Sequence, residues 1–280
     1  MTDEITVVKC GGGLSLDHEA ICRDLAALPA GRAVLVHGGA AELDLLAGRL
    51  GVPQRRLTTP SGSSSRYTDP ATLEVLLMAL AGKVKPALVA SLARHGARPV
   101  GLTGMDARLV TAKRTATHRA VLSGRKVVIR DDHSGRIRTV DPSLLVTLLD
   151  AGCLPAVSPP AIGEDGEAVN VDADRAAAAI AGALARSRPV RLVLLTAAPG
   201  VLRDPADESS LMPEITVSEE PSGDAAIMGG MTAKLQAAHD ALVAGVGTVV
   251  IADGRVAHPV RDALAGAGTT VKRVATVGSL

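Results

Sequence analysis

Short apolar runs alternate with helical patterns along most of the 280-residue chain. The runs at residues 7–9 and 33–37 are rich in valine and end close to glycines, which is typical of buried strands. Between them, residues 17–28 carry apolar side chains at helical spacing, and Pro29 and Gly31 end the pattern. Strands that alternate with helices in this way predict βαβ units. We therefore expect an α/β fold, a three-layer αβα sandwich around a mostly parallel sheet.

A long apolar helix is predicted to follow the polar, serine-rich loop at residues 58–66. Asp69 is a suitable N-cap, and Pro70 fits the first helical position, where its missing N–H needs no partner. Pro86 lies inside the apolar pattern, and a proline there removes a hydrogen bond and clashes with the preceding turn. We expect a kink or two consecutive helices, followed by a strand at residues 100–102.

Residues 108–138 form a strongly basic segment. Two strand-like stretches, residues 126–130 and 136–140, flank polar residues 131–135, and this arrangement predicts a β-hairpin. The segment has nine basic residues against two acidic ones. The basic residues are Arg108, Lys113, Arg114, Arg119, Arg125, Lys126, Arg130, Arg136 and Arg138. Such an excess occurs on ordinary solvated faces, and it also fits a docking surface for an acidic partner.

The second half of the chain has the same alternation. Strands are predicted at residues 154–158, where prolines bound the run, and at residues 190–196. An alanine-rich helix that ends near Ala185 lies between them, and either Asp172 or Asp174 caps it. The remaining predicted elements are strands at 168–171, 247–251 and 269–271, a flexible loop at 223–230 and a helix at 231–244.

Composition limits the classes of protein that fit. The chain has no Phe or Trp and one tyrosine, Tyr67, so Ala, Val, Leu and Ile must build its core. Base stacking on aromatic side chains is nearly excluded, which argues against a binder of single-stranded nucleic acid. The cysteines Cys10, Cys22 and Cys153 form no C-x-x-C pair and predict neither a zinc site nor a disulfide framework. Without a signal-peptide pattern or a run of about 18 apolar residues, a cytoplasmic protein that spans no membrane is expected.

Three glycine-rich turns are candidates for binding an anion. They are Gly11-Gly12-Gly13, Gly38-Gly39 and Gly229-Gly230. The first two follow consecutive predicted strands, so we expect them to be neighbours at one edge of the sheet. Backbone N–H groups and helix N-termini at such an edge form a good anion site. The chain has neither a G-x-x-x-x-G-K-[ST] motif nor a G-x-G-x-x-G motif after a strand, which argues against P-loop NTPases and Rossmann dehydrogenases.

Two lysines accompany these turns near opposite ends of the sequence. Lys9 directly precedes the first turn, and Lys234 lies on the predicted helix four residues after Gly230. Two ammonium groups held close together repel each other unless a carboxylate lies between them. Asp174 is the candidate for this carboxylate, although the same residue could serve only as a helix cap.

Four motifs in this order resemble the amino acid kinase superfamily, specifically its acetylglutamate kinase branch. They are Lys9-x-Gly-Gly-Gly, His37-Gly-Gly, Asn170-Val-x-Ala-Asp174 and Gly229-Gly-Met-x-x-Lys234. The resemblance covers residues 5–272, nearly the whole chain. Within the branch, the stretches at residues 65–69, 130–135, 205–211 and 252–255 look most like those of LysW-aminoadipate kinases. Those enzymes phosphorylate the side-chain carboxylate of an amino acid that is attached to a small acidic amino-group carrier protein.

The resemblance implies a role for each candidate residue. Lys9 contacts the transferring phosphoryl group, Lys234 neutralises charge on the phosphate chain, and Asp174 holds both lysines. The substrate-binding residues that it implies are Gly38, Gly39, Arg66 and Asn170. The nucleotide-binding residues that it implies are Gly11, Gly12, Gly13, Thr196, Gly200, Gly229, Gly230 and Met231. The residues expected to dock the carrier are Lys113, Arg114, Arg119, Arg125 and Lys126.

The resemblance also implies ATP as the phosphoryl donor, together with Mg²⁺. The sequence has no dedicated acidic metal cluster, so we expect no metal-ligating residues and a Mg²⁺ ion held mainly by ATP. Arg188 and Pro189 are predicted to separate two lobes. Residues 1–187 would form an N-terminal lobe for substrate binding and dimerisation, and residues 188–280 a C-terminal lobe for nucleotide binding.

Three functions are compatible with these features. The leading hypothesis is an ATP-dependent kinase that converts the side-chain carboxylate of a carrier-attached amino acid, of aminoadipate or glutamate type, into an acyl phosphate. The main alternative is an N-acetylglutamate kinase of arginine biosynthesis, whose version of the loop at residues 229–234 this chain resembles. A non-catalytic sensor on the same fold is disfavoured because both lysines and Asp174 are present. We expect a homodimer without arginine feedback, a LysW-like carrier protein as partner, and no binding to nucleic acid or membranes.

Overall fold

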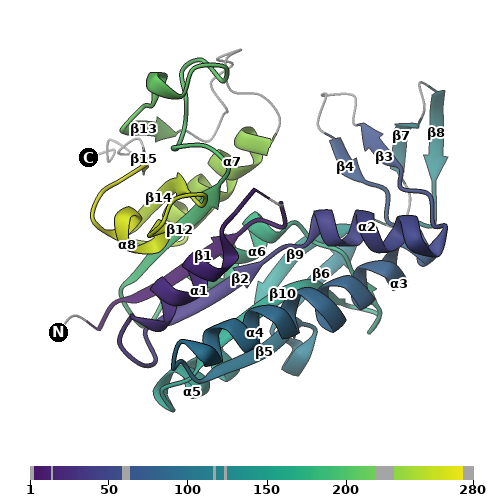
Figure 1. The fold of residues 1–280 in the computed structure, drawn as a ribbon. Helices are drawn as coiled ribbons and strands as arrows, with labels where there is room; N and C mark the ends of the chain where they lie inside the picture. Colours follow the sequence, from purple (N-terminus) through teal and green to yellow (C-terminus); the bar gives the residue numbers. More distant parts are fainter. Residues whose placement is uncertain are drawn as a thin grey trace, which may run out of the picture.

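The computed structural model describes residues 3–13, 15–58, 64–115, 118–122, 125–217 and 230–273, with residues 58, 64, 118–122 and 125–127 described by their backbone alone. Helices cover both faces of a central sheet (Figure 1), which confirms the predicted three-layer α/β fold. The strands are β1 (Ile5–Cys10), β2 (Ala33–His37), β3 (Arg56–Thr58), β4 (Ser64–Arg66), β5 (Pro99–Gly104), β6 (Val110–Arg114), β7 (His118–Leu122), β8 (Arg125–Ile129), β9 (Gly135–Val140), β10 (Leu154–Gly163), β11 (Ala168–Val169), β12 (Val190–Thr196), β13 (Glu214–Val217), β14 (Thr248–Asp253) and β15 (Thr269–Arg273). The α-helices are α1 (His18–Ala26), α2 (Ala40–Leu50), α3 (Pro70–Ala79), α4 (Lys85–Arg94), α5 (Ser143–Asp150), α6 (Ala173–Ala185), α7 (Gly230–Val243) and α8 (Pro259–Leu264). Short helical turns are the π-helical η1 (Leu80–Val84) and the 3₁₀ turns η2 (Asp106–Arg108) and η3 (Glu208–Ser210).

The main sheet runs through the whole molecule. Within the described residues it has eleven strands in the order β13-β15-β14-β12-β1-β2-β10-β6-β9, and β5 and β11 also pair with β10. β1 is parallel to both β2 and β12, so the N-terminal and C-terminal parts of the chain share one sheet. The turn between α6 and β12 contains the predicted boundary at Arg188, and the division into two lobes stays a prediction.

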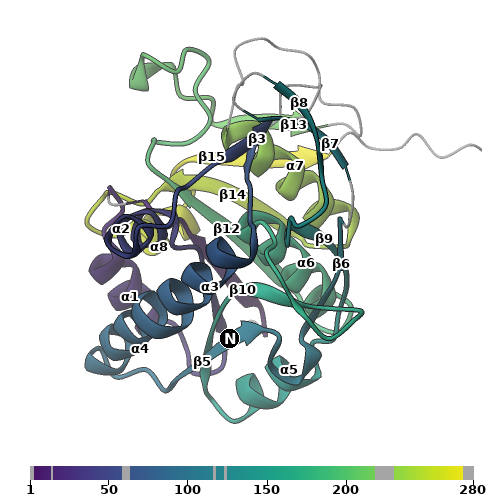
Figure 2. The same ribbon diagram turned by 90° about the vertical axis from the view of Figure 1, so that its right-hand side faces the viewer.

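Alternating side chains of the central strands divide between two cores, because neighbouring residues of a strand face opposite sides of the sheet. Val7 and Leu192 belong to the core beneath α5, α6 and α7. Val8 and Val193 belong to the core beneath α1, α4 and α8. Lys9 lies two residues after Val7, so the strand period places its side chain on the face that α6 and α7 cover. Figure 2 shows these helices at the side of the sheet away from α1 and α4.

The predicted interruption at Pro86 takes the form of a π-helical turn. α3, η1 and α4 form one helix of 25 residues, Pro70–Arg94, and η1 directly precedes the proline-containing start of α4. A wider turn accommodates a residue that can donate no backbone hydrogen bond. By length and hydropathy this is the one helix, among the described residues, that could cross a membrane. It packs against α1, α2 and β5, which accounts for its apolar side chains within the fold.

The predicted hairpin of residues 126–140 is wrong. β8 pairs with β7 in a second sheet of order β4-β3-β7-β8, whereas β9 pairs with β6 at the edge of the main sheet. We call this second sheet the small sheet; in Figure 1 it projects beyond α2 and α3. Residues 130–134 therefore pass from one sheet to the other instead of forming a turn. A short polar stretch between two strands fits either arrangement, so the local pattern could not distinguish them.

The strand predicted at residues 154–158 is longer than expected. β10 continues through Pro159 and Pro160 to Gly163. Its first half pairs with β5 and β2, and its last residues pair with β11 and β6. The prolines lie where β10 changes neighbours, a position at which missing N–H donors disturb no recorded pair of the ladder.

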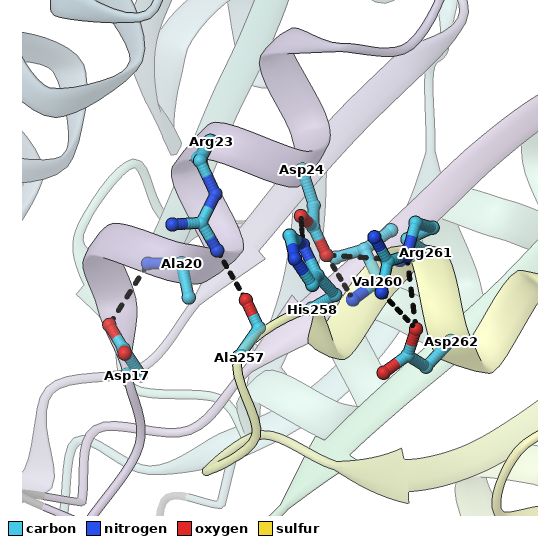
Figure 3. A network of polar contacts seen from close by, with 9 residues as sticks. All are labelled: Asp17, Ala20, Arg23, Asp24, Ala257, His258, Val260, Arg261 and Asp262. Carbon is cyan, nitrogen blue, oxygen red and sulfur yellow. Dashed lines mark hydrogen bonds and ion pairs between the residues drawn. The ribbon is translucent and has the colours of Figure 1, made fainter.

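A buried carboxylate joins α1 to α8 (Figure 3). Asp24 accepts the backbone N–H groups of Val260 and Arg261, both at 3.0 Å, and one of its oxygens lies 3.2 Å from Nδ1 of His258. Carboxylates that accept N–H groups at a helix start satisfy donors that have no partner within the helix. Asp24 therefore ties α1 to α8, the first and last helices of the described residues.

Candidate active site

Lys9, Asp174 and Lys234, which we call the lysine centre, meet on one face of the main sheet. Nζ of Lys9 lies 2.9 Å from Oδ1 of Asp174, and Nζ of Lys234 lies 2.9 Å from Oδ2. Lys9 comes from β1, Asp174 from the first turn of α6 and Lys234 from α7. Asp172 is the N-cap of α6 and accepts the N–H of Arg175 at 2.9 Å. Asp174 is therefore free of the capping role and bridges two lysines that are 225 positions apart in the sequence.

The three charges of the lysine centre are buried together, with side-chain exposures of 7%, 9% and 12% for Lys9, Asp174 and Lys234. Burial acts to raise the pKa of Asp174, but the two ammonium groups outweigh it and lower this pKa below its usual range. Burial acts to lower the pKa of Lys9, but Asp174 outweighs it and raises this pKa. Burial and repulsion by Lys9 lower the pKa of Lys234. One carboxylate between two lysines leaves the centre with excess positive charge for an anion.

The first two glycine-rich turns touch each other at Gly12 and Gly39. A Cβ built on Gly12 would lie 2.3 Å from the Cα of Gly39, so no side chain fits there. The N–H of Ala41 donates to the carbonyl oxygen of Gly12 at 3.1 Å. The turns are neighbours because β1 and β2, which precede them, pair side by side.

These turns also lie against the lysine centre. A Cβ built on Gly11 would lie 3.9 Å from Nζ of Lys9, and one on Gly38 would lie 3.8 Å from Cβ of Ala173, the residue before Asp174. α2 begins directly after the second turn, and α6 begins at Ala173. Helix N-termini carry unpaired N–H groups and partial positive charge. Two ammonium groups, two glycine-rich turns and two helix N-termini thus form a compact site for an anion.

Arg66 and Asn170, the other predicted substrate residues, are held by partners that sequence reasoning missed. Arg66 ends β4; its Nη1 donates to Oδ1 of Asp44 at 2.7 Å and also to Oε1 of Gln54. Nδ2 of Asn170 donates to Oγ1 of Thr68 at 3.0 Å. Asn170 lies four residues before Asp174, and Thr68 lies two residues after Arg66, so this bond joins the two substrate segments.

The remaining predicted nucleotide residues lie in the C-terminal part of the chain, at and after the end of β12 and at the start of α7. Thr196 ends β12, and its carbonyl oxygen accepts the N–H of Gly254 at 2.8 Å. Gly200 lies against β15, where a Cβ would come within 2.6 Å of Oγ1 of Thr269, so packing alone accounts for this glycine. Gly230 and Met231 open α7, the helix that carries Lys234. Gly229 lies outside the described residues.

The predicted docking residues divide into two groups. Lys113 on β6 is exposed, but Arg114 is engaged within the chain. Nε of Arg114 donates to the carbonyl oxygen of Asp132 at 2.9 Å, and Nη2 donates to that of Arg130 at 3.4 Å. Arg114 thus supports the passage between the two sheets. The side chains of Arg119, Arg125 and Lys126 lie outside the described part of the structure.

The donor set of the site fits a phosphate chain better than a resident metal. Ammonium and backbone N–H groups bind phosphate oxygens, and both kinds gather at the lysine centre. Across the described residues, no group of three or more His, Cys, Asp or Glu side chains is placed to hold a metal ion.

Comparison with known proteins finds kinases among the relatives of this chain. The chain is 43% identical over 267 residues to the [LysW]-aminoadipate kinase of Deinococcus radiodurans, an alignment that covers 95% of this chain and 90% of the relative. It is 41% identical to the [LysW]-aminoadipate kinase of Thermus thermophilus, with coverage of 95% and 99%. It is 36% identical to the acetylglutamate kinase of Heliobacterium modesticaldum, with coverage of 90% and 85%.

Solved structures share the fold. N-acetylglutamate synthase from Neisseria gonorrhoeae, complexed with coenzyme A and N-acetyl-glutamate, superposes with a TM-score of 0.73 at 25% identity. That match covers 99% of this chain, which spans 61% of the synthase chain. A carbamate kinase from Giardia superposes with a TM-score of 0.63 at 18% identity, covering 98% and 99% of the two chains. Since the profile of the Amino acid kinase family also matches residues 4–253, the chain belongs to this family of phosphotransferases.

Proposed function

We propose that this protein is an ATP-dependent kinase that phosphorylates the side-chain carboxylate of an amino acid attached to a small acidic carrier protein. The amino acid is of aminoadipate or glutamate type. The observation that carries the proposal is the lysine centre, where Asp174 bridges Lys9 and Lys234 beside two glycine-rich turns. The relatives named [LysW]-aminoadipate kinase support a carrier-attached substrate, because they are more similar to this chain than the acetylglutamate kinase is.

The reaction forms a bond between a substrate carboxylate oxygen and the γ-phosphorus of ATP. It breaks the bond between that phosphorus and the bridging oxygen, which leaves with ADP, and the product is an acyl phosphate. The carboxylate is already ionised at neutral pH, so no residue has to remove a proton. Catalysis therefore rests on alignment of the two reactants and on stabilisation of negative charge.

Each member of the lysine centre has its own part in this step. Lys9 stabilises the charge on the transferring phosphoryl oxygens, and Lys234 stabilises the charge that develops on the leaving ADP. Asp174 holds the two ammonium groups at a fixed separation, so little reorganisation is needed during transfer. Mg²⁺ held mainly by ATP would supply further positive charge against the phosphates, with no protein side chain required as its ligand.

The substrate binds on the side of the centre formed by Gly38, Arg66 and Asn170. Arg66 pairs with a carboxylate of the substrate and exchanges its contact with Asp44 for it, since a planar guanidinium suits bidentate binding of a carboxylate. Asn170 donates a hydrogen bond near the substituted amino group. The basic residues of the 108–138 segment attract the acidic carrier. The predicted homodimer and the cytoplasmic location stay predictions.

The proposal is tested with the purified protein, ATP, Mg²⁺ and hydroxylamine, which traps an acyl phosphate as a hydroxamate. We compare LysW loaded with aminoadipate or glutamate against free N-acetylglutamate. Turnover should depend on the carrier, and the KM for the loaded carrier should rise several-fold with salt while the KM for ATP changes little, because exposed charges are screened over about 10 Å at 0.1 M salt.

The other two functions give different results in the same assay. Equal turnover of N-acetylglutamate, without any salt effect, would support an acetylglutamate kinase instead. Binding of ATP without any hydroxamate, under conditions in which a related kinase is active, would support a sensor.

A further inference from the structure

Residues 130–134, which we call the connector, are the only described passage from β8 of the small sheet to β9 of the main sheet. The connector lies between Thr68 and Asn170. The N–H of His133 donates to the carbonyl oxygen of Thr68, and the N–H of Asn170 donates to the carbonyl oxygen of His133, both at 2.7 Å. The basic segment proposed to dock the carrier is therefore continuous with backbone that touches a proposed substrate residue.

Asp132 is the residue that fastens the connector. Its side chain is buried, at 1% exposure, and Oδ1 accepts the N–H of Thr68 at 3.0 Å and that of Ser134 at 3.1 Å. Oδ2 accepts the hydroxyl of Ser134 at 2.6 Å. A buried carboxylate that accepts several hydrogen bonds is costly to remove, because its former donors are left without partners.

Thr68 links the connector to the two proposed substrate residues, Arg66 and Asn170. Its Oγ1 accepts Nδ2 of Asn170 at 3.0 Å and lies 3.3 Å from the carbonyl oxygen of Arg66, to which it donates. Thr68 itself is fully buried. Asn170 has little freedom to move, because its backbone is also bonded to the N–H of Gly135 at 3.0 Å.

We propose that Asp132 is a positioning residue that fixes the small sheet to Thr68 and Asn170. A carrier docked on that sheet then holds its amino acid at the correct distance and orientation to the lysine centre. This inference rests on the proposed function. It follows that loss of Asp132 lowers turnover without weakening the binding of the carrier. A misplacement of about 1 Å at a reacting group can cost about 10²-fold in rate, so a loose connector is enough for a clear effect.

The chain offers a matched control. Asp141 also accepts both the N–H and the hydroxyl of the serine two residues later, Ser143, at 3.0 and 2.5 Å. Asp132 and Asp141 thus form the same local turn, but Asp132 also accepts the N–H of Thr68. Asp141 precedes α5 and has no part in the proposed site.

The experiment compares Asp132→Ala, Thr68→Val and Asp141→Ala with the parent enzyme. The Kd of the loaded carrier is measured by titration calorimetry, and kcat and the KM for ATP are measured with the hydroxamate assay. For Asp132→Ala and Thr68→Val we expect kcat to fall about tenfold, while the carrier Kd and the KM for ATP stay within about twofold. Asp141→Ala should match the parent enzyme in all three.

The double variant Asp132→Ala/Thr68→Val gives the sharpest outcome. Asp132→Ala removes the acceptor of the Thr68 N–H, and Thr68→Val removes the hydroxyl that accepts from Asn170. If these two bonds act in series, the kcat of the double variant falls no further than that of either single variant. A further tenfold loss, or a carrier Kd that rises as kcat falls, would overturn the inference. Should Asp132→Ala not fold, Thr68→Val alone decides, since an unchanged kcat there also overturns it. An inactive parent enzyme with the loaded carrier would instead contradict the proposed function itself.

Discussion

The lysine centre and the basic segment at residues 108–138 hold their charges in opposite environments. In the centre, three charged side chains are buried and paired at 2.9 Å, on elements that the main sheet holds rigidly. In the basic segment, the side chains of Lys113 on β6, Arg130 in the connector and Arg136 on β9 are all exposed. A buried charge is strong because little water screens it, whereas an exposed charge is weak individually and acts as part of a field. In the proposed function, the centre therefore does the chemistry and the basic segment selects the partner.

Removal of one lysine from the lysine centre should have the largest effect, a loss of kcat. We expect Lys234→Ala to lower kcat by about 10²- to 10³-fold, the usual cost of removing one preorganised group that stabilises transition-state charge. Lys272→Ala is the control, because Lys272 also forms a lysine–carboxylate pair, with Glu214 at 2.6 Å, but on an exposed part of β15. The hydroxamate assay measures both. Similar rates for the two variants would contradict the role assigned to Lys234.

A buried histidine on the opposite face of the main sheet should make the stability depend on pH. His37 is completely buried at the end of β2, and burial lowers its pKa from 6.5 to about 4. Below pH 6.5 the unfolded chain binds a proton that the folded chain does not accept until about pH 4, so the free energy of unfolding falls as the pH falls through this window. At about 1.4 kcal/mol per pKa unit, the loss is about 3 kcal/mol.

Urea unfolding at neutral pH and near pH 4.5 measures this loss. In His37→Gln the difference between the two pH values should be smaller by about the same amount, since glutamine binds no proton in this range. Because only the difference is compared, a general loss of stability in the variant does not affect the result. An equal fall in both proteins would show that other groups cause the acid sensitivity.

Reversal of a single exposed charge should give the smallest effect. We expect Lys113→Glu to raise the KM for the loaded carrier about fivefold at low salt, with kcat unchanged, because rim charges act mainly on encounter. Arg261→Glu is the control, since Arg261 is exposed on α8, away from the small sheet in both views (Figures 1 and 2). The effect of Lys113→Glu should disappear at high salt. A loss of kcat with constant KM would show that Lys113 acts in the chemical step and not in docking.

Several features were predictable from local patterns. β2 and β12 have the lengths that their apolar runs indicate, and Asp69 caps α3 as its position before Pro70 suggests. Local side-chain alternation and capping are set by a few neighbouring residues, so such elements can be read from the chain. A carboxylate between Lys9 and Lys234 was expected because two neighbouring ammonium groups repel each other. The assignment of roles to these residues relied on family resemblance.

Other features needed contacts between distant segments. The strands at residues 125–129 and 135–140 belong to different sheets, so their proximity in sequence was misleading. The bonds of Asp132 to Thr68 and of Thr68 to Asn170 join residues 64 and 102 positions apart, and no local signal marks them. The ion pair of Arg66 with Asp44 is of the same kind.

Patterns along the chain therefore predict the alternation of strands and helices, the glycine-rich turns and the two lysines that require a carboxylate. The fold was needed to show that β8 and β9 belong to different sheets, that α6 covers the face of the main sheet on which Lys9 lies, and that the connector contacts Asn170. The physical reason is that side-chain direction along a strand follows from a period of two residues, whereas strand order depends on the packing of the whole chain.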